Sequence, residues 1–135
     1  MSDSSPKSKL PTVVHWVAVV FLFLMMAQPT VDNVRAVVTG SFVMGDMSVD
    51  VTFANMIFHI IGTIMGWVGL VWFYKRQRRG AYLTIAAHVV GLGAALIQLP
   101  DMLFAVMPPV AIAVFFVILF VAALGPIFAF KEEYA

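Results

Sequence analysis

Two long apolar runs joined by a short basic segment dominate the pattern of this chain. Residues 53–74 and 81–99 contain no charged side chain, and residues 75–80 between them read KRQRRG. The hydrocarbon core of a membrane is about 30 Å thick, and a helix needs about 20 residues to cross it. Each run therefore predicts one membrane crossing, and the basic segment predicts a turn in water between two antiparallel helices.

Two further apolar runs flank this pair. Residues 11–28 predict the first crossing, and residues 110–130 predict the last. A longer, kinked helix that begins at Met102 is an alternative for the last crossing, so residues 102–109 belong either to that span or to a loop. The pattern predicts an all-α fold, an integral membrane four-helix bundle, built as one domain from residues 1–135.

The segment between the first and second crossings predicts a short amphipathic helix in the outer loop. Thr30 is a favourable N-cap residue, and Gly40 is a favourable residue for ending a helix. Val31, Val34 and Val38 fall on one helical face, which we expect to lie on the membrane surface or on neighbouring helices. Residues 41–50 contain glycine and two aspartates, and we expect irregular structure there.

Composition excludes a soluble fold. Of the 135 residues, 62% are hydrophobic and 11% are charged, whereas soluble domains carry about 25% charged residues. A chain this short has too little interior to bury so much apolar surface, so lipid must cover it. Cysteine is absent, which excludes disulfides, thiolate metal sites and cysteine nucleophiles.

The charges are segregated, although the net charge is only +1. Seven of the eight Lys and Arg residues lie in the N-terminal tail, the central basic segment and the C-terminal tail: Lys7, Lys9, Lys75, Arg76, Arg78, Arg79 and Lys131. The intervening loops hold only Arg35, together with Asp32, Asp46, Asp50 and Asp101. The positive-inside rule therefore predicts cytoplasmic termini in a multi-pass protein of the inner (cytoplasmic) membrane.

Small and polar residues recur every three or four positions on the two central runs. On the first run they are Asn55, His59, Gly62, Thr63 and Gly66, and on the second they are Thr84, His88, Gly91, Ala95 and Gln98. Such stripes let membrane helices approach closely, and residues 62–66 form a GxxxG pattern. We expect these stripes to face each other, with residues at equal depth having numbers that sum to about 154. Asn55 would then lie close enough to Gln98 to form a hydrogen bond.

His59 and His88 are the candidate cofactor ligands. A single histidine of this kind can hold a haem or a chlorin. The hairpin register separates the two rings by about seven residues in depth, or about 10 Å, which is too far for one iron. The alternative is that each histidine is hydrogen-bonded inside the bundle with no cofactor.

Two further groups of residues have candidate roles at the membrane surface. Met44, Met47 and Met56, with His59 close by in sequence, offer the soft ligands that Cu(I) prefers, although methionine is also common as adaptable packing. Lys75, Arg76, Arg78 and Arg79 are candidates for binding anionic lipid headgroups.

No nucleophile–base pair, phosphate-binding loop or pair of carboxylates appears in the chain, which argues against an enzyme. We expect a non-catalytic structural or accessory subunit of a larger membrane complex, energy-converting complexes included, or a homo-oligomer. One alternative is a haem-, pigment- or quinone-associated redox or photosynthetic subunit that uses His59 or His88. A second is a small transporter or a copper-handling protein. The expected partners are lipid and other membrane subunits, and a nucleic acid is not expected.

Overall fold

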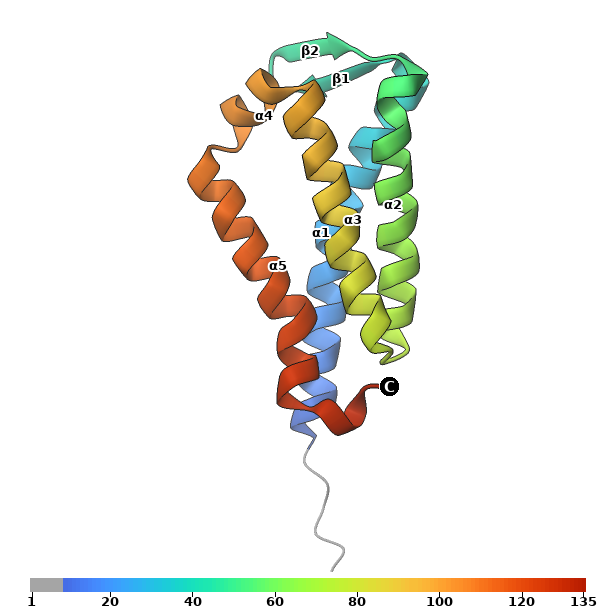
Figure 1. Cartoon of the computed structure of the whole chain (residues 1–135), viewed down its shortest axis with the longest axis vertical. Helices are drawn as coiled ribbons and strands as arrows, with labels where there is room; N and C mark the ends of the chain where they lie inside the picture. Colours follow the sequence, from blue (N-terminus) through green and yellow to red (C-terminus); the bar gives the residue numbers. More distant parts are fainter. Residues whose placement is uncertain (1–8) are drawn as a thin grey trace, which may run out of the picture.

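The computed structural model describes residues 9–135, which form a bundle of four long helices (Figure 1). The long helices are α1 (Leu10–Thr39), α2 (Phe53–Tyr74), α3 (Arg78–Gln98) and α5 (Pro109–Ala129). Each is long and apolar enough to cross a membrane, so the prediction of a helical bundle with four potential membrane spans is confirmed. The remaining elements are β1 (Ser41–Met44), β2 (Met47–Asp50), α4 (Pro100–Val106) and the 3-10 turn η1 (Lys131–Glu133).

The connecting elements lie at the two ends of the bundle (Figure 1). The start of α1, the α2–α3 turn and the C-terminal segment are at one end. The β1–β2 hairpin and α4 are at the other. Within residues 9–135, the start of α1, the α2–α3 turn and the C-terminal segment, which carry most of the basic residues, therefore lie at the same end of the bundle.

α1 is longer than the predicted first span because Pro29 lies inside it and does not end it. The separate loop helix expected after Thr30 is not present, since its residues are the last turns of α1. A proline has no N–H, so Pro29 leaves the Met25 carbonyl without its helical donor, and polar side chains form other hydrogen bonds close by. The Thr30 hydroxyl donates to the Met26 carbonyl at 2.6 Å, and the Trp67 indole N–H donates to Thr30 at 3.0 Å. Gly40 ends the helix in the left-handed region, at φ 74°, as expected.

Residues 41–50 form a β hairpin, so the expectation of irregular structure there is wrong. Ser41 pairs with Asp50 and Met44 pairs with Met47 across the two antiparallel strands. The Phe42 side chain is buried and packs in a cluster with Met56 of α2. This contact folds the hairpin over the end of the bundle, where its backbone pairing satisfies polar groups that would otherwise have no partner.

α2 and α3 are in close contact along a line of glycines. A β carbon on Gly62 would lie 3.1 Å from the Ala87 carbonyl, and one on Gly69 would lie 2.7 Å from the backbone N of Thr84. Gly62 also lies opposite Gly91. The pairs Gly62–Gly91 and Gly69–Thr84 both have numbers that sum to 153, close to the expected register of about 154.

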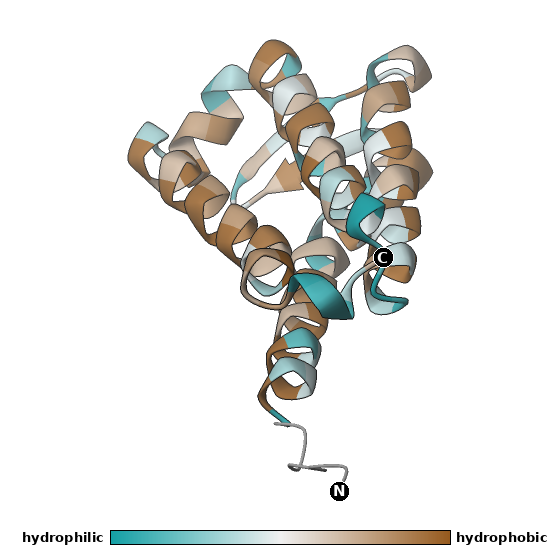
Figure 2. Ribbon diagram, turned by 60° about the horizontal axis from the view of Figure 1, so that its bottom comes forward, coloured by the Kyte–Doolittle hydropathy of each residue, from teal (hydrophilic) through white to brown (hydrophobic). Residues whose placement is uncertain are grey.

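α5 is the most loosely attached and most apolar of the four helices. It begins at Pro109, separate from α4, so the shorter of the two alternatives for the last span is the one observed. Figure 2 shows hydrophobic residues along most of α5 and hydrophilic ones in the turn that follows it. Leu119 and Ala123 are buried against the interior, and the outward side chains are exposed. In a membrane this outward surface contacts lipid or another protein.

Candidate functional site

A cavity of about 220 Å³ lies between α1, α2, α3 and α5, beneath the hairpin. His59 of α2 and His88 of α3 both line it. Most of the remaining wall is apolar, with Met26, Leu92 and Phe115 among the side chains that form it. The two histidines that the sequence singled out therefore share one internal space, although their helices place them at different depths.

His88 has one ring nitrogen bound and one without a partner. Its Nδ1 lies 2.8 Å from the Thr84 carbonyl oxygen, one helical turn earlier. Because a carbonyl only accepts hydrogen bonds, Nδ1 carries the proton, and Nε2 of the neutral ring is an acceptor. Nε2 is buried with no hydrogen-bond partner, and the whole residue is only 9% exposed.

The surroundings of His88 are an aromatic ring and a carbonyl. The Phe115 ring centroid is 5.7 Å from that of His88. The Met25 carbonyl also lies close to the His88 ring. Pro29, four residues further on, has no N–H to donate to that carbonyl. The proline in α1 therefore adds a second acceptor beside this histidine.

His59 is equally buried, at 6% exposure, but it has a polar neighbour. The Gln98 side chain lies close to the His59 ring. However, Nε2 of His59 and Oε1 of Gln98 both lack a hydrogen-bond partner. A small side-chain rotation would let these two groups satisfy each other. His59 also lies beside Phe42 of the hairpin, with ring centroids 5.1 Å apart.

The cavity also has a polar rim on α1 that the sequence analysis missed. Asp32 and Asn33 line the cavity, and the Asn33 amide donates to the Thr63 hydroxyl at 2.8 Å. The sequence pattern places these residues in a separate helix of the outer loop, because it ends the first crossing at residue 28. The available signal was the polar spacing from Gln28 to Asp32, one helical turn, which the structure shows as a hydrogen bond of 3.0 Å.

The proposed packing residues have four different surroundings. Gly62, Gly66, Thr84 and Gly91 lie where α2 meets its neighbours, and Ala95 lines the cavity. Gln98 is half-buried beside His59. Asn55 is exposed, and the expected hydrogen bond between it and Gln98 is not formed. Its backbone N–H instead donates to the Thr52 hydroxyl, which caps α2.

The three candidate copper ligands lie in the hairpin and directly beneath it, and Met44 packs against the cluster that contains Met56. Met44 and Met47 are cross-strand partners in the hairpin, and Met44 lines the cavity. Met56 is buried beneath the hairpin with Phe42 and Leu99. Within residues 9–135 no cluster of three or more His, Asp or Glu side chains has the arrangement of a metal site.

At the opposite end of the bundle, the C-terminal segment binds two of the arginines that were expected to face lipid headgroups. Arg78 donates from its backbone N–H to the Ala135 carbonyl at 2.7 Å and from its guanidinium to the Lys131 carbonyl at 2.9 Å. Arg76 forms an ion pair with Glu133 at 2.9 Å. Arg79 stacks on the Trp72 ring, which leaves these cations engaged with the protein itself.

Tyr134 anchors this C-terminal segment in the bundle. His15 Nε2 lies 3.2 Å from the Tyr74 carbonyl, so Nε2 carries the proton and Nδ1 accepts from the Tyr134 hydroxyl at 2.8 Å. The Tyr134 side chain is 3% exposed. Burial raises the pKa of the Tyr134 phenol above its ordinary value, against the opposing effect of Arg76. The sequence alone did not indicate that His15 and Tyr134 form a contact.

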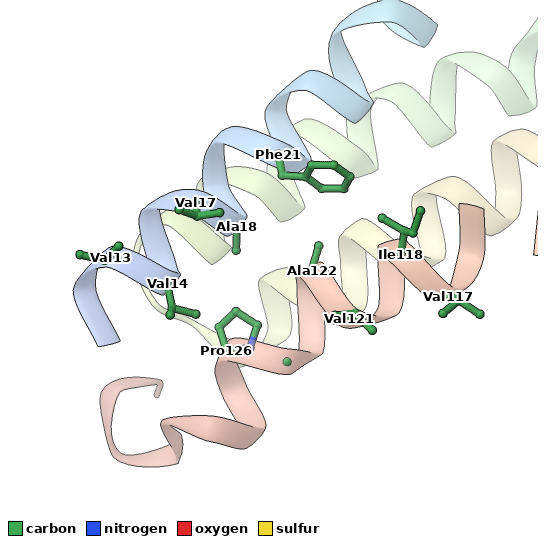
Figure 3. Close-up of a pocket in the computed structure, with 11 residues that line it drawn as sticks. Val13, Val14, Val17, Ala18, Phe21, Val117, Ile118, Val121, Ala122 and Pro126 are labelled. Atoms are coloured by element: carbon green, nitrogen blue, oxygen red, sulfur yellow. The ribbon is translucent and has the colours of Figure 1, made fainter. Parts of the chain in front are cut away.

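A second hollow of about 540 Å³ lies between the first half of α1 and the second half of α5. Figure 3 shows Val17 and Phe21 of α1 on one side and Ile118 and Val121 of α5 on the other. All its lining residues are hydrocarbon in character. We call it the α1–α5 groove, and its lining has no polar or charged side chain.

Comparison with known proteins does not supply a function for this arrangement. The chain matches no protein-family model, no curated protein and no solved structure.

Proposed function

We propose that this protein is a non-catalytic membrane subunit that holds a small molecule in the cavity lined by His59 and His88. One observation carries the proposal: two histidines, each more than nine-tenths buried, line one cavity inside the membrane, and each has an unpartnered Nε2. An unsatisfied buried polar group costs about 1–3 kcal/mol. Gln98 can satisfy His59 by a small rotation, so the unpartnered Nε2 of His88 is what supports a ligand that supplies the missing partner.

The test fills the cavity without disturbing the helix. Gly91 lines the cavity, and a β carbon added there meets no atom within 4 Å. Gly93, on the same helix, is equally open but does not line the cavity. We expect Gly91→Leu to lose a small molecule that co-purifies in mild detergent, whereas Gly93→Leu keeps it, as measured by mass spectrometry of organic extracts. Equal content in the two variants would contradict the proposal.

Among the redox alternatives, the size of the cavity favours a single ring, as in the quinone–hydroquinone class, over a haem or another tetrapyrrole pigment. A cavity of about 150 Å³ holds one benzene ring, and four pyrrole rings need far more room than the 220 Å³ observed. We therefore expect the purified protein to show no Soret or chlorin band. A band that His88→Phe abolishes would favour the tetrapyrrole instead.

A second candidate role, an accessory subunit of a larger complex or a homo-oligomer, is supported by the α1–α5 groove. Its hydrocarbon lining can receive a helix from a neighbouring chain. The chain has no cysteine, so Val121→Cys in the groove and Ile64→Cys on the exposed face of α2 give a matched pair. Disulfide dimers of V121C but not I64C in native membranes would support self-association. A monomer without neighbours would contradict the assembly role.

The copper-handling or transporter alternative draws on Met44, which packs against the cluster that contains Met56, and on Met47, its partner across the hairpin. It predicts copper in the purified protein that is lost when Met44 and Met47 are changed to Leu. Unchanged copper content in that double variant would end it.

We further propose that the basic end of the bundle faces the cytoplasm and that the membrane is the inner membrane. Within residues 9–135, support comes from six cationic residues at one end, Lys9, Lys75, Arg76, Arg78, Arg79 and Lys131. Asp46 and Asp50 lie at the other end, where Arg35 is the one Lys or Arg. Lys75→Cys and Asp46→Cys place single labels at the two ends. An impermeant maleimide on intact cells should label only D46C, and labelling of both from one side would contradict this orientation.

A further inference from the structure

We propose that the ligand of this cavity is a compact ring that carries a hydroxyl group, a phenol or a hydroquinone, and that its hydroxyl donates to Nε2 of His88. This inference rests on the proposed binding role of the cavity and adds the chemical class of the ligand. It also assigns different roles to the two histidines.

The polarity of the ligand follows from which atoms lack partners. Nε2 of His88 is an acceptor because Nδ1 carries the proton that goes to the Thr84 carbonyl. The nearby Met25 carbonyl can only accept as well. Because this part of the wall offers acceptors and no free donor, a ligand with a donor group matches it, and a ligand with only carbonyl oxygens does not.

His88 is preferred to His59 because His59 has an internal substitute. Oε1 of Gln98 is itself buried and unpartnered, and it lies beside His59. These two groups can complete each other by a small movement. No protein donor stands beside Nε2 of His88 in the described part of the chain, so a bound molecule is what would satisfy it.

The size and shape of the space indicate one ring. The 220 Å³ volume exceeds the about 150 Å³ that encloses a benzene molecule by enough for a few substituent atoms. Phe115 stands beside His88 at 5.7 Å and can pack against a flat ring bound there. A membrane-soluble ring with one hydroxyl therefore satisfies both the apolar wall and Nε2 of His88.

The probes are 4-ethylphenol and 4-ethyltoluene, which have the same shape and differ in the hydroxyl. Each is measured by equilibrium dialysis against the full chain in lipid nanodiscs, with empty nanodiscs to subtract partition into lipid. We expect 4-ethylphenol to bind about tenfold more tightly, the effect of one hydrogen bond to a buried acceptor. Heptan-1-ol, a flexible alcohol, should bind less well than 4-ethylphenol, and equal binding would overturn the assignment of a ring.

The variants separate this inference from the proposed binding role. His88→Phe should bind both rings equally, whereas His59→Phe should keep the preference for 4-ethylphenol. The ¹⁵N signal of His88 Nε2, assigned by its loss in H88F, should shift with 4-ethylphenol and stay unchanged with 4-ethyltoluene. If both rings bind equally to the unmodified chain and G91L blocks both, the cavity is a binding site but the ligand class is wrong. If neither ring binds, or if G91L has no effect, the binding role itself fails.

Discussion

Replacing Gly80 by alanine is the most direct test of how α2 and α3 pack. A β carbon at Gly80 would overlap the backbone N of Phe73, lie 2.6 Å from the Gly69 carbonyl and lie 2.7 Å from the backbone carbon of Trp72. All three atoms belong to the main chain of α2, so none can move aside by rotating a side chain. The helices must separate next to the turn that joins them.

The expected loss of stability follows from two opposing effects. Overpacking costs about 1–3 kcal/mol where neighbours can adjust, and we expect the upper end of that range because these neighbours are backbone. Alanine in a helix gains up to about 1 kcal/mol over glycine. Gly80→Ala should therefore lower the free energy of unfolding by about 2 kcal/mol. In Gly93→Ala the new β carbon meets nothing, so only the gain remains.

The assay is reversible unfolding of both variants in mixed micelles, followed by circular dichroism. The two variants carry the same chemical change on the same helix, and we expect their free energies of unfolding to differ by about 3 kcal/mol. If Gly80→Ala is as stable as Gly93→Ala, Gly80 does not face Phe73, and the α2–α3 register described above is refuted.

Three further changes test other contacts. Gly66→Ala should cost clearly less than Gly80→Ala in the same assay, because its β carbon would overlap only the flexible end of Met26 and would lie at an ordinary 3.5 Å from the Ala87 β carbon; an equal cost would show that Met26 is fixed. Tyr134→Phe removes the donor to buried His15 and should cost about 1–2 kcal/mol, whereas Tyr82→Phe at an exposed ring should cost nothing measurable. Because burial raises the pKa of Tyr134 in the folded state above the ordinary 10.0, the unfolded chain loses its proton first. Stability should therefore fall as the pH rises above 10 in the unmodified protein, and Tyr134→Phe should remove that part of the fall. Glu133→Gln breaks an ion pair that is partly exposed on both sides, so it should cost less than about 1 kcal/mol and nothing at high salt; a larger cost would mean that this pair holds the C-terminal segment in place.

The hydrophobic pattern was sufficient for the crossings but not for their ends. Residues 53–74 match α2 at both ends, because a charged or polar boundary stands on each side. α1 was predicted eleven residues short, from 28 to Thr39, because a proline usually stops a helix in water. In a packed membrane helix, Thr30 and Trp67 supply hydrogen bonds around the interruption.

The sequence identified the two histidines of the candidate site but not the cavity that they share. His59 and His88 stood out because polar side chains on membrane spans are few and costly. Their common cavity did not, because it depends on how four helices and a hairpin fit together. Asp32 and Asn33 join the site only because α1 continues past Pro29.

The sequence alone determined the number of potential crossings and which polar segments share an end of the bundle. Both follow from the length and charge of each segment, which do not depend on how the helices pack. Tertiary structure alone decided that His88, whose buried Nε2 has no partner, lines a cavity and that Tyr134 contacts His15 across 119 residues. In lipid every apolar face is equally tolerated. The choice of contacts therefore depends on shape and on the few available hydrogen bonds, which no pattern along one chain records.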